Sequence, residues 1–282
     1  MKINEYRRRT QNTLKELFGD EAEPLCDILL CHYMNVDRSE LLLKGDDEFD
    51  EALRPGMDNA VNELGYGIPV QYIIGNCWFF GRKIKVGKGV FIPRCDTETL
   101  VETALHVIPE NGSFADICSG SGCISAAIAA NRKDVTGYAL ELSYKALPYT
   151  EENLEEFSKV TVKRFDALDE DDYYSLLKQK KDKFDVIVCN PPYIRAAEMD
   201  FLQQQIQYEP RSALDGGEDG LDYYRRITAL SDIILKENGV LLYELGYDQS
   251  GDVALIMQEN GFQTATVKDL NGIERVILGK KY

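Results

Sequence analysis

The feature that most constrains the fold of this chain is the alternation of short apolar runs with helical stretches from Ser113 onward. The apolar runs have the length and β-branched content of buried strands, and most are separated by stretches with helical spacing. The runs lie at 114–118, 135–141, 160–165, 184–189, 240–245, 262–268 and 275–278. Such alternation predicts a mostly parallel, doubly wound, seven-stranded sheet.

The last two predicted strands are joined differently from the others. Only residues 269–272 lie between them, which is too short a link for a crossover helix. We therefore expect these two strands to pair antiparallel. A reversed final strand on a parallel sheet distinguishes the methyltransferase-type sheet from ordinary dinucleotide-binding sheets.

The first part of the chain has another pattern. Apolar residues from Asn4 to about Gly67 recur at helical spacing and are divided by short turns, which predicts a small helical domain over 1–68. Alternating apolar residues and glycine-containing turns then predict two short strands in a hairpin that links two domains. The expected segments are strands at 69–75 and 78–86, a β-hairpin linker over 69–92, and a sheet domain over 93–282 whose first helix has Asp96 or Thr97 as its N-cap.

Composition excludes several classes of partner and site. The net charge of −16 repels phosphate backbones, so no DNA is expected as a partner and a basic protein fits better. No apolar run is long enough to span a membrane, and the N-terminus lacks the apolar segment of a signal peptide, so a cytoplasmic location is expected. The seven cysteines include no Cys-x-x-Cys pair and the two histidines have no partner at ligand spacing, so no metal is expected.

The tetrapeptide Asn190-Pro191-Pro192-Tyr193 follows the predicted buried strand 184–189, at the end where open α/β sheets bind ligands. The two prolines fix φ and lack N–H groups, so the chain leaves the strand as a stiff, extended loop. The Asn190 side-chain oxygen and the Pro191 carbonyl can accept two hydrogen bonds from one planar –NH2 group, and Tyr193 offers a ring face. The loop therefore suits an amide or amino nitrogen, although a Pro-Pro pair is also common in simple surface turns.

A candidate cofactor site follows the earlier strands. Gly120 and Gly122 lie where the first strand turns into a helix, so that backbone N–H groups can approach a ligand. Glu141 ends the next strand, where an acid can accept both hydroxyls of a ribose, and Asp166 ends the third, where it can accept an adenine amino group. NAD and S-adenosylmethionine both satisfy this pattern. The missing third glycine of the dinucleotide fingerprint and the amide-binding loop favour methyl transfer.

Four motifs in this order resemble the release factor glutamine methyltransferases, the HemK/PrmC family, and the resemblance covers nearly the whole chain. The motifs are Ile92-Pro93-Arg94-x-Asp96-Thr97-Glu98, Asp116-Ile117-Cys118-Ser119-Gly120-Ser121-Gly122, Asn190-Pro191-Pro192-Tyr193-Ile194 and the segment from Glu209-Pro210-Arg211 to Asp219-Gly220-Leu221.

The resemblance implies an α/β protein with the class I S-adenosylmethionine-dependent methyltransferase fold and a small N-terminal helical domain. It implies methyl transfer from S-adenosylmethionine to the side-chain amide nitrogen of the glutamine in the Gly-Gly-Gln motif of class I peptide chain release factors. The residues that it implies for the cofactor are Cys118, Ser119, Gly120, Ser121 and Gly122 at the methionine part, Glu141 at the ribose, Asp166 and Ala167 at the adenine, and Asn190. It implies that Asn190, Pro191, Pro192 and Tyr193 hold the glutamine, with Asn190, Pro191 and Tyr193 catalytic.

This sequence departs from the family pattern at three cofactor positions: Cys118 replaces a glycine, Glu141 an aspartate and Ala167 an aromatic residue. Three other functions stay open. They are a glutamine methyltransferase of a ribosomal protein, an adenine-N6 nucleic-acid methyltransferase, and a protein that binds S-adenosylmethionine without catalysis. The helical domain is expected to dock the protein substrate, and a monomer is expected.

Overall fold

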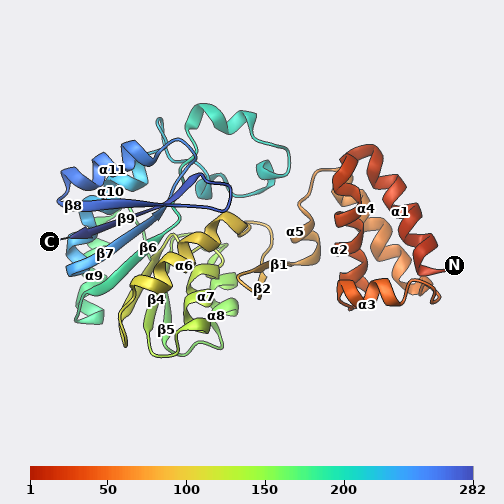
Figure 1. Ribbon diagram of the computed structural model, residues 1–282, viewed down its shortest axis with the longest axis horizontal. Helices are drawn as coiled ribbons and strands as arrows, with labels where there is room; N and C mark the ends of the chain where they lie inside the picture. Colours follow the sequence, from red (N-terminus) through yellow and green to blue (C-terminus); the bar gives the residue numbers. More distant parts are fainter. Residues whose placement is uncertain (282) are drawn as a thin grey trace. The chain divides into compact units, whose positions relative to one another are not determined.

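The computed structural model describes residues 1–281, and the chain divides into two compact units (Figure 1). Unit 1 comprises Met1–Asn76 together with Gln203–Tyr208, and unit 2 comprises Cys77–Leu202 and the chain from Glu209 onward. None of the helices within the described residues combines the length and apolar character needed to cross a bilayer.

Unit 1 contains the expected helical domain, but it extends beyond the predicted bounds of 1–68 to Asn76 and includes Gln203–Tyr208. Its apolar core is formed by fully buried residues such as Leu14, Leu29 and Leu30, and Tyr6 stacks on Phe49 with ring centroids 3.9 Å apart. Because the apolar residues recur at helical spacing, each long helix buries one stripe of its surface. The helices are α1 (Ile3–Phe18), α2 (Ala22–Met34), α3 (Arg38–Leu43), α4 (Arg54–Gly65) and α5 (Val70–Ile74), with 3-10 turns at Gly19–Glu21 and Glu51–Leu53.

The strand predicted over 69–75 is wrong, because α5 occupies Val70–Ile74. Val70 is buried in the unit 1 core and Ile73 and Ile74 pack against the same core. The spacing i, i+3, i+4 places these three side chains on one face of a helical turn, whereas a strand would divide them between two faces. A short apolar run does not by itself distinguish the two.

The hairpin is formed instead by β1 (Asn76–Phe79) and β2 (Arg82–Lys85), which make a two-stranded sheet. Its two turn residues, Phe80 and Gly81, both have positive φ, of 48° and 71°. Positive φ at both central residues is the geometry of a type I′ hairpin turn, whose twist matches that of the strands.

Unit 2 contains the predicted seven-stranded sheet, in the order β5-β4-β3-β6-β7-β9-β8. Strands β3 to β7 pair in parallel, while β9 pairs antiparallel with both β7 and β8, which confirms the reversed final strand. The bounds are β3 (Ser113–Ile117), β4 (Thr136–Glu141), β5 (Val160–Arg164), β6 (Phe184–Cys189), β7 (Leu235–Glu244), β8 (Phe262–Lys268) and β9 (Glu274–Lys281).

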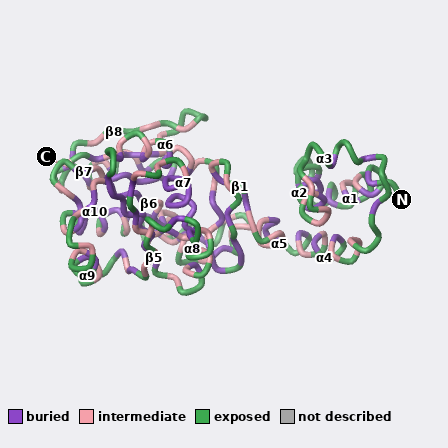
Figure 2. Tube along the Cα trace, turned by 90° about the horizontal axis from the view of Figure 1, so that it is seen from below, coloured by how far each residue is buried: buried purple, intermediate pink, exposed green. Residues whose placement is uncertain are grey.

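Helices cover both faces of this sheet, with α6, α7 and α8 packed in one row and α9, α10 and α11 in another. The central strands β3 and β6 consist almost entirely of buried residues, and β6 lies in the buried middle of the unit in Figure 2. Covering both faces explains why these strands read as continuous apolar runs rather than as alternating ones. The helices are α6 (Glu98–Val107), α7 (Cys123–Asn131), α8 (Leu147–Leu154), α9 (Glu170–Lys180), α10 (Asp222–Ile234) and α11 (Ser250–Glu259).

Candidate active site

The predicted site residues all follow the carboxyl ends of neighbouring parallel strands. The glycine turn follows β3, Glu141 ends β4, Asp166 and Ala167 follow β5, and the Asn190 loop follows β6. Because these strands are parallel and adjacent in the order β5-β4-β3-β6, their carboxyl ends meet at one edge of the sheet. The fold thus brings the two predicted halves of the site, for cofactor and for acceptor, to the same edge.

The glycine turn over residues 118–122 has left-handed backbone at three positions, with φ of 60° at Cys118, 57° at Gly120 and 78° at Gly122. A Cβ on Gly122 would lie 3.1 Å from Thr150 Cγ2, so the absent side chain lets the turn pack closely on α8. A Cβ on Gly120 would meet nothing within 4 Å. The backbone at Gly120 therefore faces open space, as a ligand-binding turn requires.

Glu141 fastens this turn to the end of β4. Its Oε2 accepts a hydrogen bond of 2.7 Å from the Gly120 N–H and its Oε1 one of 2.7 Å from the Ser143 N–H. The side chain is 9% exposed, and burial raises the pKa of its carboxyl group, while the backbone hydrogen bonds oppose that rise. Each carboxylate oxygen has a second lone pair, so Glu141 retains acceptor capacity for a ligand hydroxyl.

Asp116 begins the glycine-turn motif of the sequence but is not among the predicted site residues. It is fully buried in β3, and its Oδ2 accepts hydrogen bonds from the hydroxyls of Ser119 at 3.0 Å and Ser125 at 2.7 Å. Its Oδ1 and the Ser121 hydroxyl oxygen have no hydrogen-bond partner among residues 1–281. Burial raises the pKa of Asp116 to about 7. A single acid inside an apolar strand is the sequence signal that marks this position.

Asp166 follows β5 at the edge where the cofactor is predicted, but two of its polar groups make hydrogen bonds within its own turn. Its N–H donates to Asp172 Oδ2 at 2.7 Å, and its Oδ1 accepts from the Leu168 N–H at 2.9 Å. Ala167 is buried. Burial raises the pKa of Tyr223, and the charges of Cys118 and Asp166 raise it further. The Tyr223 side chain of α10 packs against the same buried cluster as Ala167.

The loop Asn190–Tyr193 is held in place by the segment that follows Glu209. Gly216 donates its N–H to the Ile194 carbonyl at 2.8 Å, and a Cβ there would lie 2.7 Å from Tyr193 Cα and 2.9 Å from the Pro192 oxygen. Gln249 Nε2 donates to the Tyr193 carbonyl at 3.0 Å. Pro191 and Pro192 are buried and Tyr193 is half-buried. The loop is therefore a fixed part of the sheet edge, and the sequence reasoning did not find Gln249.

Thr97 occupies the N-cap position of α6, which is one of the two expected positions, but its side chain makes no capping hydrogen bond. A 3-10 turn at Cys95–Thr97 precedes the helix. The Thr97 hydroxyl instead accepts a hydrogen bond of 3.3 Å from Asn190 Nδ2. The nitrogen end of the Asn190 amide thus faces Thr97, and its oxygen end points the other way.

Two of the sequence motifs meet at an ion pair whose carboxylate is buried and whose guanidinium is partly exposed. Glu209, 5% exposed, pairs with Arg94 and accepts the Ile92 N–H at 2.9 Å. Burial raises the pKa of Glu209, and the Arg94 charge opposes that rise. The Arg94 guanidinium also lies 4.8 Å from the centre of the Phe91 ring. This contact fixes the residues just before Thr97 to the segment that supports the Asn190 loop.

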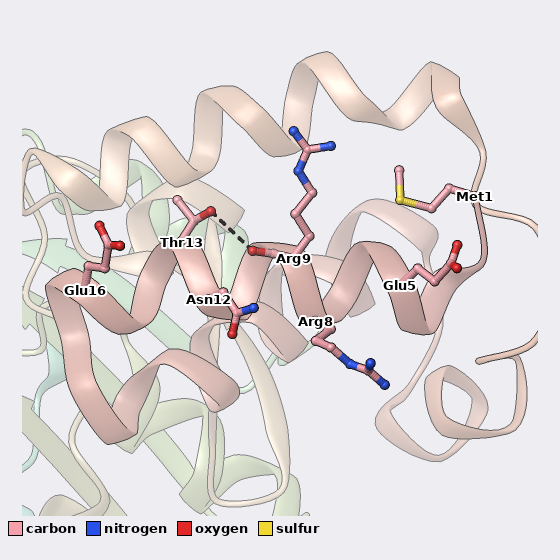
Figure 3. A pocket seen from close by; sticks show the side chains of 7 residues that line it. All are labelled: Met1, Glu5, Arg8, Arg9, Asn12, Thr13 and Glu16. Atoms are coloured by element: carbon pink, nitrogen blue, oxygen red, sulfur yellow. Dashed lines mark hydrogen bonds between the residues drawn. The ribbon is translucent and has the colours of Figure 1, made fainter.

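A separate hollow of about 570 Å³ lies on α1 in unit 1 (Figure 3). Within it, the Thr13 hydroxyl donates to the Arg9 carbonyl at 3.2 Å. It contains none of the predicted site residues. No group of His, Cys, Asp and Glu arranged to hold a metal ion occurs within residues 1–281. The lining side chains are Met1, Glu5, Arg8, Arg9, Asn12, Thr13 and Glu16.

Comparison with known proteins agrees with this architecture. Residues 5–75 match the PrmC N-terminal domain, and residues 83–219 match the methyltransferase small domain. The chain is 35% identical to a release factor glutamine methyltransferase of Clostridium acetobutylicum, over 99% of this chain and 98% of that protein. It is 32% identical to one of Bacillus cereus, over 99% of each chain.

Two solved structures share the fold. A methyltransferase from Pyrococcus furiosus superposes with a TM-score of 0.52 at 14% identity and covers 79% of this chain and 98% of its own. A protein complexed with SAH superposes with a TM-score of 0.50 at 11% identity and covers 71% of this chain and 53% of its own.

Proposed function

We infer that this chain, which belongs to the family of release factor glutamine methyltransferases, transfers a methyl group to the glutamine side chain of a peptide release factor. The methyl donor in this proposal is S-adenosylmethionine, and the acceptor is the amide nitrogen of the glutamine in the Gly-Gly-Gln motif of class I release factors. The observation that carries the proposal is the fixed Asn190 loop, whose amide nitrogen is turned inward against Thr97.

An amide nitrogen is a weak nucleophile, because its lone pair is delocalised into the carbonyl group. In our proposal the two hydrogens of the glutamine amide bond to the Asn190 Oδ1 and the Pro191 carbonyl. These bonds aim the nitrogen and stabilise the positive charge that develops on it. The buried prolines keep both acceptors in place, and Pro192 and Tyr193 form the wall beside the glutamine. As the N–CH3 bond forms, the S–CH3 bond would break and leave a neutral thioether. One amide proton would then pass to water, because the motif itself contains no general base.

S-adenosylmethionine supplies an electrophilic sulfonium methyl group when it is bound. The residues at the β3 edge fit its polar groups, because Asp116 Oδ1 and the Ser121 hydroxyl are buried without a partner among residues 1–281 and Gly120 faces open space. In our proposal Glu141 holds the ribose. The residues that would hold the methionine part are Cys118, Ser119, Gly120, Ser121 and Gly122, and those at the adenine are Asp166 and Ala167, with Asn190 beside both ligands.

Unit 1 is proposed to dock the release factor, and the reaction is proposed to take place in the cytoplasm. The net charge of −16 favours a basic surface on the partner. If charge steers the encounter, raising the salt concentration should increase the KM for the release factor and leave kcat unchanged. A KM that does not depend on salt would contradict this part of the proposal.

The substrate is tested by transfer of labelled methyl from S-adenosylmethionine to a purified class I release factor. The matched controls are the same factor with its Gly-Gly-Gln motif changed to Gly-Gly-Ala, and a duplex DNA. We expect label on the unaltered factor alone. Label on the Gly-Gly-Ala factor would reject the assigned glutamine, and label on DNA would favour the adenine-N6 activity.

A further inference from the structure

Glu244 is a buried acid to which the mechanism above gives no role. It is the last residue of β7 and is 1% exposed. Its Oε2 has no hydrogen-bond partner within residues 1–281. Burying an incompletely paired carboxylate is costly, so its position next to the reaction site calls for a functional explanation.

Glu244 lies directly behind the acceptor loop. The register of β6 and β7 pairs Cys189 with Tyr243, so Asn190, which follows β6, lies level with Glu244, the last residue of β7. Burial raises the pKa of the Glu244 carboxyl group, whereas hydrogen bonding from the Thr97 hydroxyl and from the Asn190 amide lowers it. Thr97 is itself 1% exposed and accepts the hydrogen bond from Asn190 Nδ2. The three side chains form one cluster behind the loop.

We propose that Glu244 is a positioning residue that, with Thr97, holds the Asn190 amide with its nitrogen inward and its oxygen toward the substrate. The inference rests on the proposed function, in which the Asn190 oxygen accepts a hydrogen bond from the glutamine amide. The two ends of an asparagine amide have nearly the same shape, so packing alone does not choose between them. An ionised carboxylate has no donor, and it therefore favours the nitrogen end of the amide.

The charge on Glu244 sets the strength of this preference. Burial raises its pKa to about 7, against the lowering effect of the Thr97 hydrogen bond. The other groups that interact with it are Arg275 of β9, which lowers its pKa, and Asp96 of the 95–97 turn, which raises it. Asn190, Tyr193, Cys189 and Tyr224 of α10 also interact with it, and the Tyr224 hydroxyl donates to the Glu244 backbone carbonyl at 2.8 Å. A protonated carboxyl group gains an O–H donor that can bond to the amide oxygen, which permits the reversed amide. The value of kcat should therefore rise with pH through about 7 and then level off.

The test is methyl transfer to a class I release factor by the full-length wild type and by Glu244→Gln. The kcat of each is measured between about pH 6 and about pH 9, in steps of about one pH unit on either side of the Glu244 pKa. Glutamine has a donor and an acceptor and can satisfy either orientation of Asn190. We expect kcat at high pH to fall about tenfold, which is the value of one charged hydrogen bond. The rise of kcat with pH should disappear, while the KM for the release factor stays within about twofold, since the loop itself is intact.

Two variants at Thr97 form a matched pair that does not depend on the folding of Glu244→Gln. Thr97→Ser keeps the hydroxyl and should retain most of kcat, whereas Thr97→Val removes it and should lower kcat. Equal rates for these two variants, a flat pH profile of the wild type, or an unaltered profile in Glu244→Gln would each overturn the inference. The wild-type enzyme distinguishes failure of this inference from failure of the proposed function. If the wild type transfers no methyl group to the release factor, the proposed function is rejected as well.

Discussion

Replacing Gly216 with alanine tests whether the Asn190 loop must be held in one position. The new Cβ would lie 2.7 Å from Tyr193 Cα, 2.9 Å from the Pro192 oxygen and 2.9 Å from Tyr193 C. All three are backbone atoms, which cannot turn away as a flexible side chain would. Ordinary van der Waals contact begins at 3.4 Å, so the loop has to move by about 0.7 Å. The φ of Gly216 is outside the left-handed region, so this clash is the only reason for a loss.

A misplacement of about 1 Å at a reacting group can cost on the order of a hundredfold in rate. We therefore expect Gly216→Ala to lower kcat by about 10- to 100-fold, or about 1.4 to 2.7 kcal/mol of transition-state stabilisation. Initial rates of methyl transfer measure the loss. Calorimetric titration with S-adenosylmethionine should show a smaller change in Kd than in kcat, since the clash is with Pro192 and Tyr193 and not with Asn190.

The matched control is Gly251→Ala, an exposed position in α11 where a Cβ would meet nothing within 4 Å. This variant should keep its kcat and lose no stability, because alanine suits a helix better than glycine. A Gly216→Ala enzyme with a kcat within about twofold of the wild type would refute the reasoning, since it would show that the loop tolerates displacement.

Three further predictions concern the cofactor edge. Glu141→Ala should weaken the binding of S-adenosylmethionine about 10- to 100-fold in calorimetric titration, the value of one charged hydrogen bond, and an unchanged Kd would argue against the ribose assignment. Cys118→Gly relieves a left-handed residue with φ of 60° and should raise the free energy of unfolding by up to about 1 kcal/mol in urea titration, whereas a loss would show that the thiol packs favourably. Burial raises the pKa of Asp116 to about 7, so the stability that its protonated form contributes is complete below about 3.8 and is lost as the pH rises through 7. The free energy of unfolding of the wild type should therefore fall over this pH range relative to that of Asp116→Asn. A difference between the two proteins that is the same at low and at neutral pH, measured by urea titration, would contradict this prediction.

The sheet could be predicted from the sequence because each of its strands carries a local signal. Residues 184–189 and 262–268 have the predicted bounds, since their apolar or β-branched content and flanking turns agree with the fold. The helix α5 could not be predicted, because its three apolar residues suit a helical turn and a strand equally well until the core of unit 1 is known. The start of β7 at Leu235 was also not predicted, because the residues that follow Leu235 are polar and lack the apolar signal of a buried strand.

The site divides in the same way. The glycine turn and the Asn190 loop could be predicted, because a left-handed backbone favours glycine and a stiff extended loop favours proline, and both residue types are visible in the sequence. Thr97, Glu244 and Gln249 could not, because ordinary polar residues far apart in the chain become supports only when the fold brings them together. Of these three, only Thr97 belongs to a motif that the sequence singled out, and there it was expected to cap a helix.

The central claim is that the Asn190 loop positions a glutamine amide for methylation. The most direct measurement is the kcat of Asn190→Ala on a class I release factor, with the methylated residue located by fragment mass spectrometry of the product. We predict that the wild type places the methyl group on the glutamine side chain of the Gly-Gly-Gln motif, and that the variant loses at least about 100-fold in kcat. Near-normal turnover by Asn190→Ala, or a methyl group on another residue, would contradict the account.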